Sequence, residues 1–195
     1  MDKSGSHLRV ALLHAGYMRT NRPDPEDVHL MDSLAISGFD IVAASHSHRI
    51  SGYRHIKTFR DRQSFCFYGL GSLVSGYISS YLEREGLIVV AALTAEGHLV
   101  EVEIRAVLID KGGFGQIPAE EDGTVMLDRF HNLSGEIDDG SYAKLFYHDA
   151  SQGLVKLYLQ DVRAAFHSAG VCGLSKKARR IRFRHVRRLV HKVIN

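Results

Sequence analysis

The sequence has few of the features that mark a secreted or membrane-spanning protein. It holds only two cysteines among its 195 residues. These are Cys66 and Cys172, which lie far apart and show neither metal-type spacing nor a disulfide framework. No uninterrupted apolar run reaches the roughly 18 residues of a membrane span, and the start, MDKSGSHLRV, lacks the apolar core of a signal peptide. The chain as written is therefore expected to stay in the cytoplasm.

Acidic residues are absent from the C-terminal end. Nine of the 25 Lys and Arg residues lie within residues 173–195, whereas all 22 Asp and Glu residues come earlier. The body is therefore acidic and the end is a basic helical tail, which is expected to contact an acidic polymer or a membrane surface, or to fold back on the body. Contact with a membrane would make the protein membrane-peripheral. Nucleic acid is the disfavoured partner, because the body is acidic and carries no RNA-binding signature.

Two familiar catalytic loops are also missing. KGGFGQ, residues 111–116, resembles a fragment of a phosphate-binding loop but lacks the Lys-Ser/Thr ending and the following helix. No Gly-x-Ser-x-Gly element marks a serine hydrolase. Neither a nucleotide-binding loop nor a nucleophilic serine is therefore predicted.

The first part of the chain predicts a strand–helix–strand unit. Leu8 to Leu13 is a compact apolar run, typical of a buried strand, and it ends at His14. Asp24 is a candidate N-cap for a helix that ends at Gly38. Asp40 to Ala44 follows as a second strand, so a parallel, helix-covered sheet is expected. The apolar face of the helix is assigned to Leu30, Leu34 and Ala35.

The remaining pattern predicts further strands and then helices. Polar turns and alternation indicate strands over Arg54–Phe59 and Ser64–Tyr68, and a hairpin built from residues 86–94 and 99–109. Helical spacing is found near 125–133 and again over 154–166. We expect three regions: 1–118 as the folded domain, 119–172 as a polar connector with an amphipathic helix, and 173–195 as the basic tail.

Histidines follow both of the first two strands. His14 ends the first, and the second runs into Ala44-Ser-His-Ser-His48. Because the carboxyl ends of parallel strands meet at one edge of a sheet, His14, His46 and His48 are expected close together. Neutral imidazole is a good ligand for zinc, manganese or iron. A surface loop without metal remains the alternative, since twelve histidines in one chain bring some close together by chance.

The order of motifs resembles a known family. LLHAG, a helix, FDIVAASHSHRISGY, FCFYGLGSLV and a hairpin are similar to the second half of CapA-type capsule-biosynthesis proteins, over roughly Leu8 to Pro118. These bacterial proteins are associated with poly-γ-glutamate synthesis and are related to calcineurin-like phosphoesterases. The resemblance implies an α/β fold, namely a partial metallophosphatase-like sandwich with a β-hairpin and C-terminal helices.

The resemblance also implies roles for individual residues. His14, His46 and His48 match histidines that bind divalent metal (Mn, Zn or Fe), and His14 and His46 would be catalytic in a metal-dependent phosphoesterase-like hydrolase. Arg19 and Arg49, by position, and Ser72, by its place in the YGLGSL motif, would contact the substrate.

The departures from the family pattern limit this expectation. Ala15 replaces a tryptophan, Ser45 replaces a glycine or histidine, and Ser72 replaces an asparagine. The early elements that supply carboxylate and amide ligands have no counterpart before His14. The chain is therefore expected to be incomplete as a catalyst, with its metal either held or lost, unless another polypeptide supplies the N-terminal half. The alternative is a non-catalytic accessory or anion-binding subunit.

Overall fold

The computed structural model describes residues 8–18, 20–57, 63–75, 81–95 and 97–151. Arg19, Cys172, the helix expected over 154–166 and the basic tail lie outside these ranges. The chain divides into two compact units after Ala143, and the second is described only over residues 144–151, which are helical. None of the helices in the described ranges is long and apolar enough to cross a bilayer.

The first sheet has four strands in the order β1-β2-β4-β3. Their bounds are Val10–Leu13 for β1, Ile41–Ala44 for β2, Tyr53–Lys57 for β3 and Gln63–Phe67 for β4. The first three strands in that order run parallel, and β3 pairs antiparallel with β4. The predicted parallel unit is confirmed, and every residue of β2 is buried at its centre.

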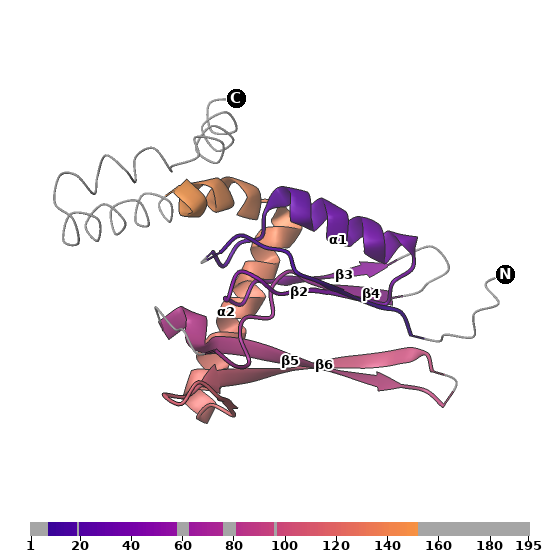
Figure 1. Ribbon diagram of the computed structural model, residues 1–195. Coiled ribbons are helices and arrows are strands. Elements are labelled where there is room, and N and C mark those ends of the chain that lie inside the picture. The colour runs from indigo at the N-terminus through magenta and orange to yellow at the C-terminus, as the bar shows by residue number, and fades with distance from the viewer. Residues whose placement is uncertain (1–7, 19, 58–62, 76–80, 96, 152–195) are drawn as a thin grey trace, which may run out of the picture. The chain divides into compact units, whose positions relative to one another are not determined.

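Helix α1, Pro25–Ser37, connects β1 to β2 and covers one face of this sheet (Figure 1). The Asp24 side chain accepts the Glu26 N–H, and Gly38 ends the helix in the left-handed conformation, so both predicted boundaries are confirmed. The predicted apolar face was partly wrong, because Leu30 is 49% exposed. Val28, Met31 and Ala35 are the residues that this helix buries.

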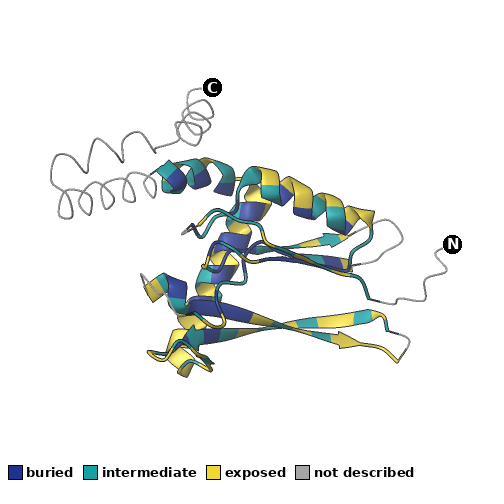
Figure 2. Cartoon of the chain, in the orientation of Figure 1, coloured by how far each residue is buried: buried dark blue, intermediate teal, exposed yellow. Residues whose placement is uncertain are grey.

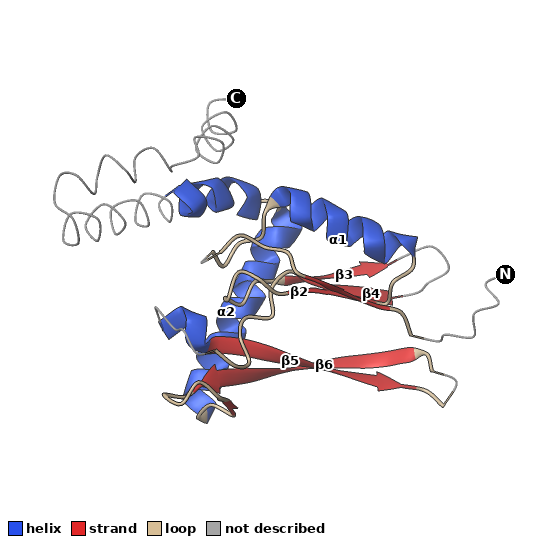
Figure 3. Cartoon of the chain, viewed as in Figure 1, coloured by secondary structure: helices blue, strands red, loops and turns tan. Residues whose placement is uncertain are grey.

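The second sheet is the expected hairpin with a short third strand. Strands β5, Glu85–Leu93, and β6, Leu99–Ile109, pair antiparallel, and β7, Gly115–Gln116, adds to β6. A 3-10 helix, η1, Tyr81–Arg84, precedes β5. The hairpin lies along the face of the first sheet opposite α1 (Figure 3), with Ile41, Ala43, Phe67 and Leu87 buried between the layers.

Strand β1 differs from its prediction as a buried strand. Ala11 and Leu13 pack on the side of α1, but Val10 is 44% and Leu12 80% exposed. Their neighbours in register on β2, Ile41 and Ala43, are buried. The cause is position, since β1 is an edge strand of the described sheet, and the described residues do not cover its opposite face as they cover that of β2 (Figure 2).

Helix α2, Glu120–Asp139, is longer than the helix predicted near 125–133, and it contacts β3 and β6. Phe130 and Ile137 on this helix are almost fully buried, in the two different apolar clusters. The Ser134 hydroxyl accepts the Tyr53 N–H at 3.0 Å. Because α2 falls within the unit ending at Ala143, it packs as part of the folded domain, while the division at 118/119 into independent domains stays a prediction.

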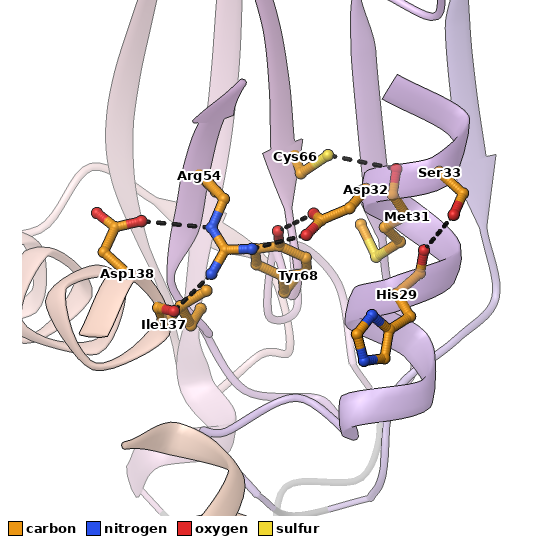
Figure 4. A network of polar contacts seen from close by, with 9 residues as sticks. All are labelled: His29, Met31, Asp32, Ser33, Arg54, Cys66, Tyr68, Ile137 and Asp138. Atoms are coloured by element: carbon orange, nitrogen blue, oxygen red, sulfur yellow. Dashed lines mark hydrogen bonds and ion pairs between the residues drawn. The ribbon is translucent and has the colours of Figure 1, made fainter. Parts of the chain in front are cut away.

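A polar network fastens α1, β3 and α2 together (Figure 4). Arg54 donates to Asp32 at 2.6 Å, to Asp138 at 3.4 Å and to the Ile137 carbonyl. The buried Tyr68 hydroxyl donates to the other oxygen of Asp32. Two more ion pairs hold α2, one from Arg22 to Glu136 and one from Arg129 to the fully buried Glu85.

Candidate functional site

The candidate site lies where β1, β2 and β4 reach their carboxyl ends. The Ser45 N–H donates to the Leu13 carbonyl at 3.0 Å, and the Leu70 N–H donates to the Ala44 carbonyl at 3.1 Å. These bonds continue the parallel ladders beyond the strands. They bring the residue after β1, the Ser-His-Ser-His loop after β2 and the Gly-Leu-Gly-Ser loop after β4 to one edge.

Two of the three predicted histidines touch. The rings of His14 and His46 lie edge to face with centroids 4.4 Å apart, and those of His46 and His48 are 6.5 Å apart. His14 and His48 are exposed and His46 is half-buried, so all three reach the surface. The expected juxtaposition of His14 with His46 is found, whereas His48 stands further away.

The backbone at His48 explains that separation. Its φ of 57° makes it the one non-glycine residue with a positive φ among the described residues, a conformation that costs about 1–3 kcal/mol and is concentrated at functional sites. The turn is held by Ser47, a buried residue whose hydroxyl donates to the Arg49 carbonyl at 3.0 Å. The His48 ring then lies with Nδ1 3.3 Å from the Ser72 hydroxyl.

Of the predicted substrate contacts, Ser72 and Arg49 lie in described positions. Ser72 is buried against His48, so its hydroxyl orients that imidazole in this arrangement. Arg49 donates to the Asn21 side chain at 3.3 Å, and Asn21 donates to the Ile50 carbonyl at 2.9 Å. These bonds fasten the loop that follows His14 to the loop that carries His46 and His48.

Burial and the neighbouring imidazoles favour the neutral form of His46. Burial lowers the pKa of this imidazole, and the adjacent His14 and His48 lower it further because a second positive charge would be unfavourable there. Asp27 acts in the opposite direction. A neutral imidazole has a free nitrogen lone pair, which is the form that binds a metal.

Asp27 is a carboxylate beside the cluster that was not predicted from the sequence. Its position in the first turn of α1 suits the positive end of the helix dipole, which by itself indicates no site. In the structure its carboxylate accepts the N–H of Gly16, and it lies within electrostatic reach of His46. Burial is the main reason that the pKa of Asp27 is raised, and the carboxylate of Asp24 adds to it. Only the tertiary packing of the helix against the loop after His14 reveals this neighbour.

The residues at this edge nevertheless supply fewer ligands than a metal centre needs. Over the part of the chain that the structure describes, no three His, Cys, Asp or Glu side chains converge as a metal-holding group. Zinc centres use three or four protein ligands, and a two-metal centre needs more. The site as described offers one contacting imidazole pair, a third imidazole further away and a carboxylate that is already hydrogen-bonded.

Comparison with known proteins gives one family. Residues 1–77 match the family described as bacterial capsule synthesis protein PGA_cap, whose members have a metallophosphatase-like fold. The match contains the whole four-stranded sheet, α1 and the three histidines, whereas the hairpin and α2 lie beyond it. A comparison with curated proteins gives no match.

Proposed function

We propose that this chain, whose residues 1–77 match the bacterial capsule synthesis protein family, uses its histidine edge as one half of a metal-dependent site. The observation that carries the proposal is the contact between His14 and His46, with centroids 4.4 Å apart, at the meeting point of parallel strands. Sites in open α/β sheets gather at that edge. The other half would come from residues outside the described ranges or from another polypeptide.

The residues present suit particular tasks. His14, His46 and His48 would be the imidazole ligands of a divalent zinc, manganese or iron ion. Bound there, such a metal would polarise a phosphoryl oxygen and activate water. Ser72 orients His48 through the 3.3 Å contact, and the guanidinium of Arg49, held beside Asn21, suits an anionic oxygen of the substrate. Arg19 is proposed as a second cation by sequence position alone.

Without carboxylate ligands for the metal, the chain alone should have little hydrolytic activity. A phosphoester hydrolysis of this kind needs ligands that complete the metal sphere and a fixed water. We therefore expect the purified chain to hydrolyse bis(p-nitrophenyl) phosphate with added Mn²⁺ hardly above the rate of its His46→Ala, His48→Ala variant. A polypeptide that supplies the missing half should raise that rate.

Metal binding tests the proposal directly. The intact chain and the His46→Ala, His48→Ala variant would be equilibrated with Zn²⁺, passed through a desalting column and assayed for bound zinc. A matched control is His98→Ala, a histidine in the turn between β5 and β6, away from this edge. More zinc on the wild type and on the control than on the double variant is expected. Equal zinc on all three proteins would refute the site.

A second candidate function is favoured by the charge distribution. Residues 173–195 carry nine cations and no acidic residue, so this tail suits an anionic polymer such as poly-γ-glutamate or an anionic membrane surface. In this alternative the protein is a non-catalytic subunit that holds the capsule polymer. Deleting 173–195 should then abolish binding to polyglutamate and to phosphatidylserine vesicles that weakens with salt. Unchanged salt-sensitive binding would reject the tail as the contact.

A further inference from the structure

The loop that follows His14 packs against the loop that carries the other two histidines. Gly16 is the point of contact, since a Cβ built on it would lie 3.4 Å from the Ser47 backbone nitrogen. This backbone contact stands beside the ring contact of His14 with His46, whose centroids are 4.4 Å apart. A group that fixes Gly16 therefore also fixes how these two imidazoles meet.

Asp27 ties Gly16 to helix α1. This half-buried residue lies in the first turn of the helix, and its carboxylate accepts the Gly16 N–H. An acidic residue in the first turn commonly accepts an N–H at the start of its own helix. In α1 the side chain of Asp24 already has that role, since it accepts the Glu26 N–H at 3.0 Å. The Asp27 carboxylate therefore serves the histidine loop rather than the cap of its own helix.

The far end of the same loop has attachments of its own. Asn21 donates to the Ile50 carbonyl at 2.9 Å, and Arg22 pairs with Glu136 of α2 at 2.6 Å. Asp27 acts near the other end, two residues from His14. A change at Asp27 should therefore alter the histidine edge while the loop as a whole stays in place.

The fold disfavours a charge on Asp27. Burial raises the pKa of this carboxyl group, and the carboxylate of Asp24 raises it further. The interaction with His46 has the opposite effect on both groups, because it lowers the pKa of Asp27 and raises that of the imidazole. An asparagine could accept the Gly16 N–H without this unfavourable charge. The imidazoles nearby therefore explain a carboxylate at this position better than the fold does.

We propose, on the basis of the function proposed above, that Asp27 is a positioning residue of the histidine edge. It holds the loop through Gly16 and orients the His46 imidazole, so that the ring nitrogen further from Asp27 keeps its lone pair for a divalent metal ion. Imidazoles that bind metals commonly have such a supporting carboxylate, and its loss weakens metal binding about 10–100-fold. In this role Asp27 acts through His46 and is not itself a ligand.

Three variants separate the charge of Asp27 from its hydrogen bond. Asp27→Asn keeps an oxygen that can accept the Gly16 N–H but removes the charge, whereas Asp27→Ala removes both. Asp24→Asn is the matched control, because it removes a charge from the same helix start and asparagine is an equally good N-cap. Long-range proton–nitrogen NMR spectra of the metal-free proteins would report the tautomer of His46, and visible absorption would report Co²⁺ binding.

The charge of Asp27 should decide both measurements. We expect one His46 tautomer to predominate in the wild type and a mixture of the two in Asp27→Asn. Co²⁺ affinity should fall at least about tenfold in Asp27→Asn and stay unchanged in Asp24→Asn. Asp27→Asn should also keep the urea midpoint and the Gly16 amide signal of the wild type, because the fold and the tie to the loop are preserved.

Other results would overturn the inference. These are an unchanged His46 tautomer in Asp27→Asn, an equal loss of Co²⁺ affinity in Asp24→Asn, or a loss in Asp27→Ala that Asp27→Asn does not share, which would make Asp27 a structural tie only. Failure of the proposed function would look different. In that case the wild type would bind Co²⁺ no better than the His46→Ala, His48→Ala variant, while the His46 tautomer would still change in Asp27→Asn. That result would withdraw the metal and retain the orientation of His46 by Asp27.

Discussion

At the scale of single residues, Gly71 shows how the site loop is placed. This glycine has a φ of 71°, and a Cβ on it would lie 2.2 Å from the Glu85 carbonyl oxygen. That close approach lets the Ser72 N–H donate to the same oxygen at 3.1 Å. Ser72 is thereby held beneath His48, so the backbone of the Gly-Leu-Gly-Ser loop supports the histidine edge.

Gly71→Ala should therefore destabilise the protein by at least about 3 kcal/mol, because strain at a positive φ adds to a backbone clash. The matched control is Gly140→Ala, at a φ of 80° with no atom within 4 Å of the added Cβ. That change should cost only about 1–2 kcal/mol. Urea denaturation followed by circular dichroism measures both, and equal losses would contradict the close-packing explanation.

Cys66 gives a prediction for pH. Burial raises the pKa of its thiol to about 12 from 9.0, so the folded protein keeps the proton after the unfolded chain has released it. The stability that this thiol contributes is present below pH 9.0 and is lost as the pH rises from there toward 12. The same burial raises the pKa of Tyr68, so it acts in the same direction.

Unfolding midpoints in urea should fall between pH 9 and pH 10.5, and Cys66→Ala should make that fall shallower. The native protein would be treated with iodoacetamide at pH 8, and peptide mapping would separate Cys66 from Cys172. Cys66 should stay unmodified, because the thiolate is the reactive form of cysteine and burial keeps this thiol protonated. Rapid native modification of Cys66, or an identical pH slope in the variant, would contradict its burial.

The histidine loop shows what the sequence could and could not predict at this scale. Strand ends predicted that His14 and His46 would be neighbours, because parallel strands end at a common edge. Residues two apart in an extended segment point the same way, which would place His46 and His48 side by side. The left-handed φ at His48 breaks that alternation and turns the ring toward Ser72. Histidine is one of the non-glycine residues found more often at a positive φ, but the sequence does not show which of the two histidines adopts it.

At the scale of elements, the side chain of Arg54 attaches helix α2 to strand β3 and helix α1. Arg54 on β3 joins Asp32 of α1 to Asp138 and the Ile137 carbonyl of α2 (Figure 4). Its side chain is 26% exposed, and that of Asp32 is 19% exposed. Removing the guanidinium would leave a sheltered carboxylate and a helix carbonyl with fewer donors, which is costly.

Arg54→Met keeps most of the stem and should cost about 2–4 kcal/mol, somewhat less than the loss of a fully buried partner. Arg105→Met is the control, since Arg105 pairs with Glu103 on the exposed face of β6. It should leave the unfolding midpoint unchanged. A small effect at Arg54, similar to that at Arg105, would show that α2 is held by apolar contacts instead.

The helices also show which features can be predicted from neighbouring residues alone and which depend on tertiary packing. The caps of α1 were predictable because Asp24 and Gly38 act within one turn of the helix. Its buried face was not fully predictable. Leu30 and Met31 are both apolar, and only the position of the sheet determines that Met31 is buried and Leu30 is exposed. Helix α2 extends beyond the stretch near 125–133, and Glu136, one of the polar residues in the added part, is paired with Arg22.

At the scale of the molecule, the family match and the folded unit have different extents. The match ends at residue 77, whereas the compact unit runs to Ala143 and includes the hairpin and α2. Glu85, at the start of β5, is fully buried and paired with Arg129 of α2. A cut before α2 would remove Phe130 and Ile137 and expose the apolar residues that they cover. It would also leave the buried Glu85 carboxylate without its cation, Arg129.

We therefore expect residues 1–143 to fold cooperatively and residues 1–118 to fail. Both fragments would be unfolded in urea, with circular dichroism and amide hydrogen exchange as measurements. A single transition with protected β2 amides is expected for 1–143 only. A stable 1–118 fragment would instead confirm the boundary predicted from the sequence and make α2 an accessory.

The central claim is that His14, His46 and His48 form the imidazole half of a metal site at the carboxyl edge of the sheet. X-ray absorption spectroscopy of the intact chain loaded with one equivalent of Zn²⁺ tests it most directly. We predict two or three imidazole ligands at about 2.0–2.1 Å, with water completing the coordination, and fewer imidazoles in His46→Ala. Sulfur ligation, or an imidazole count that His46→Ala leaves unchanged, would contradict the claim.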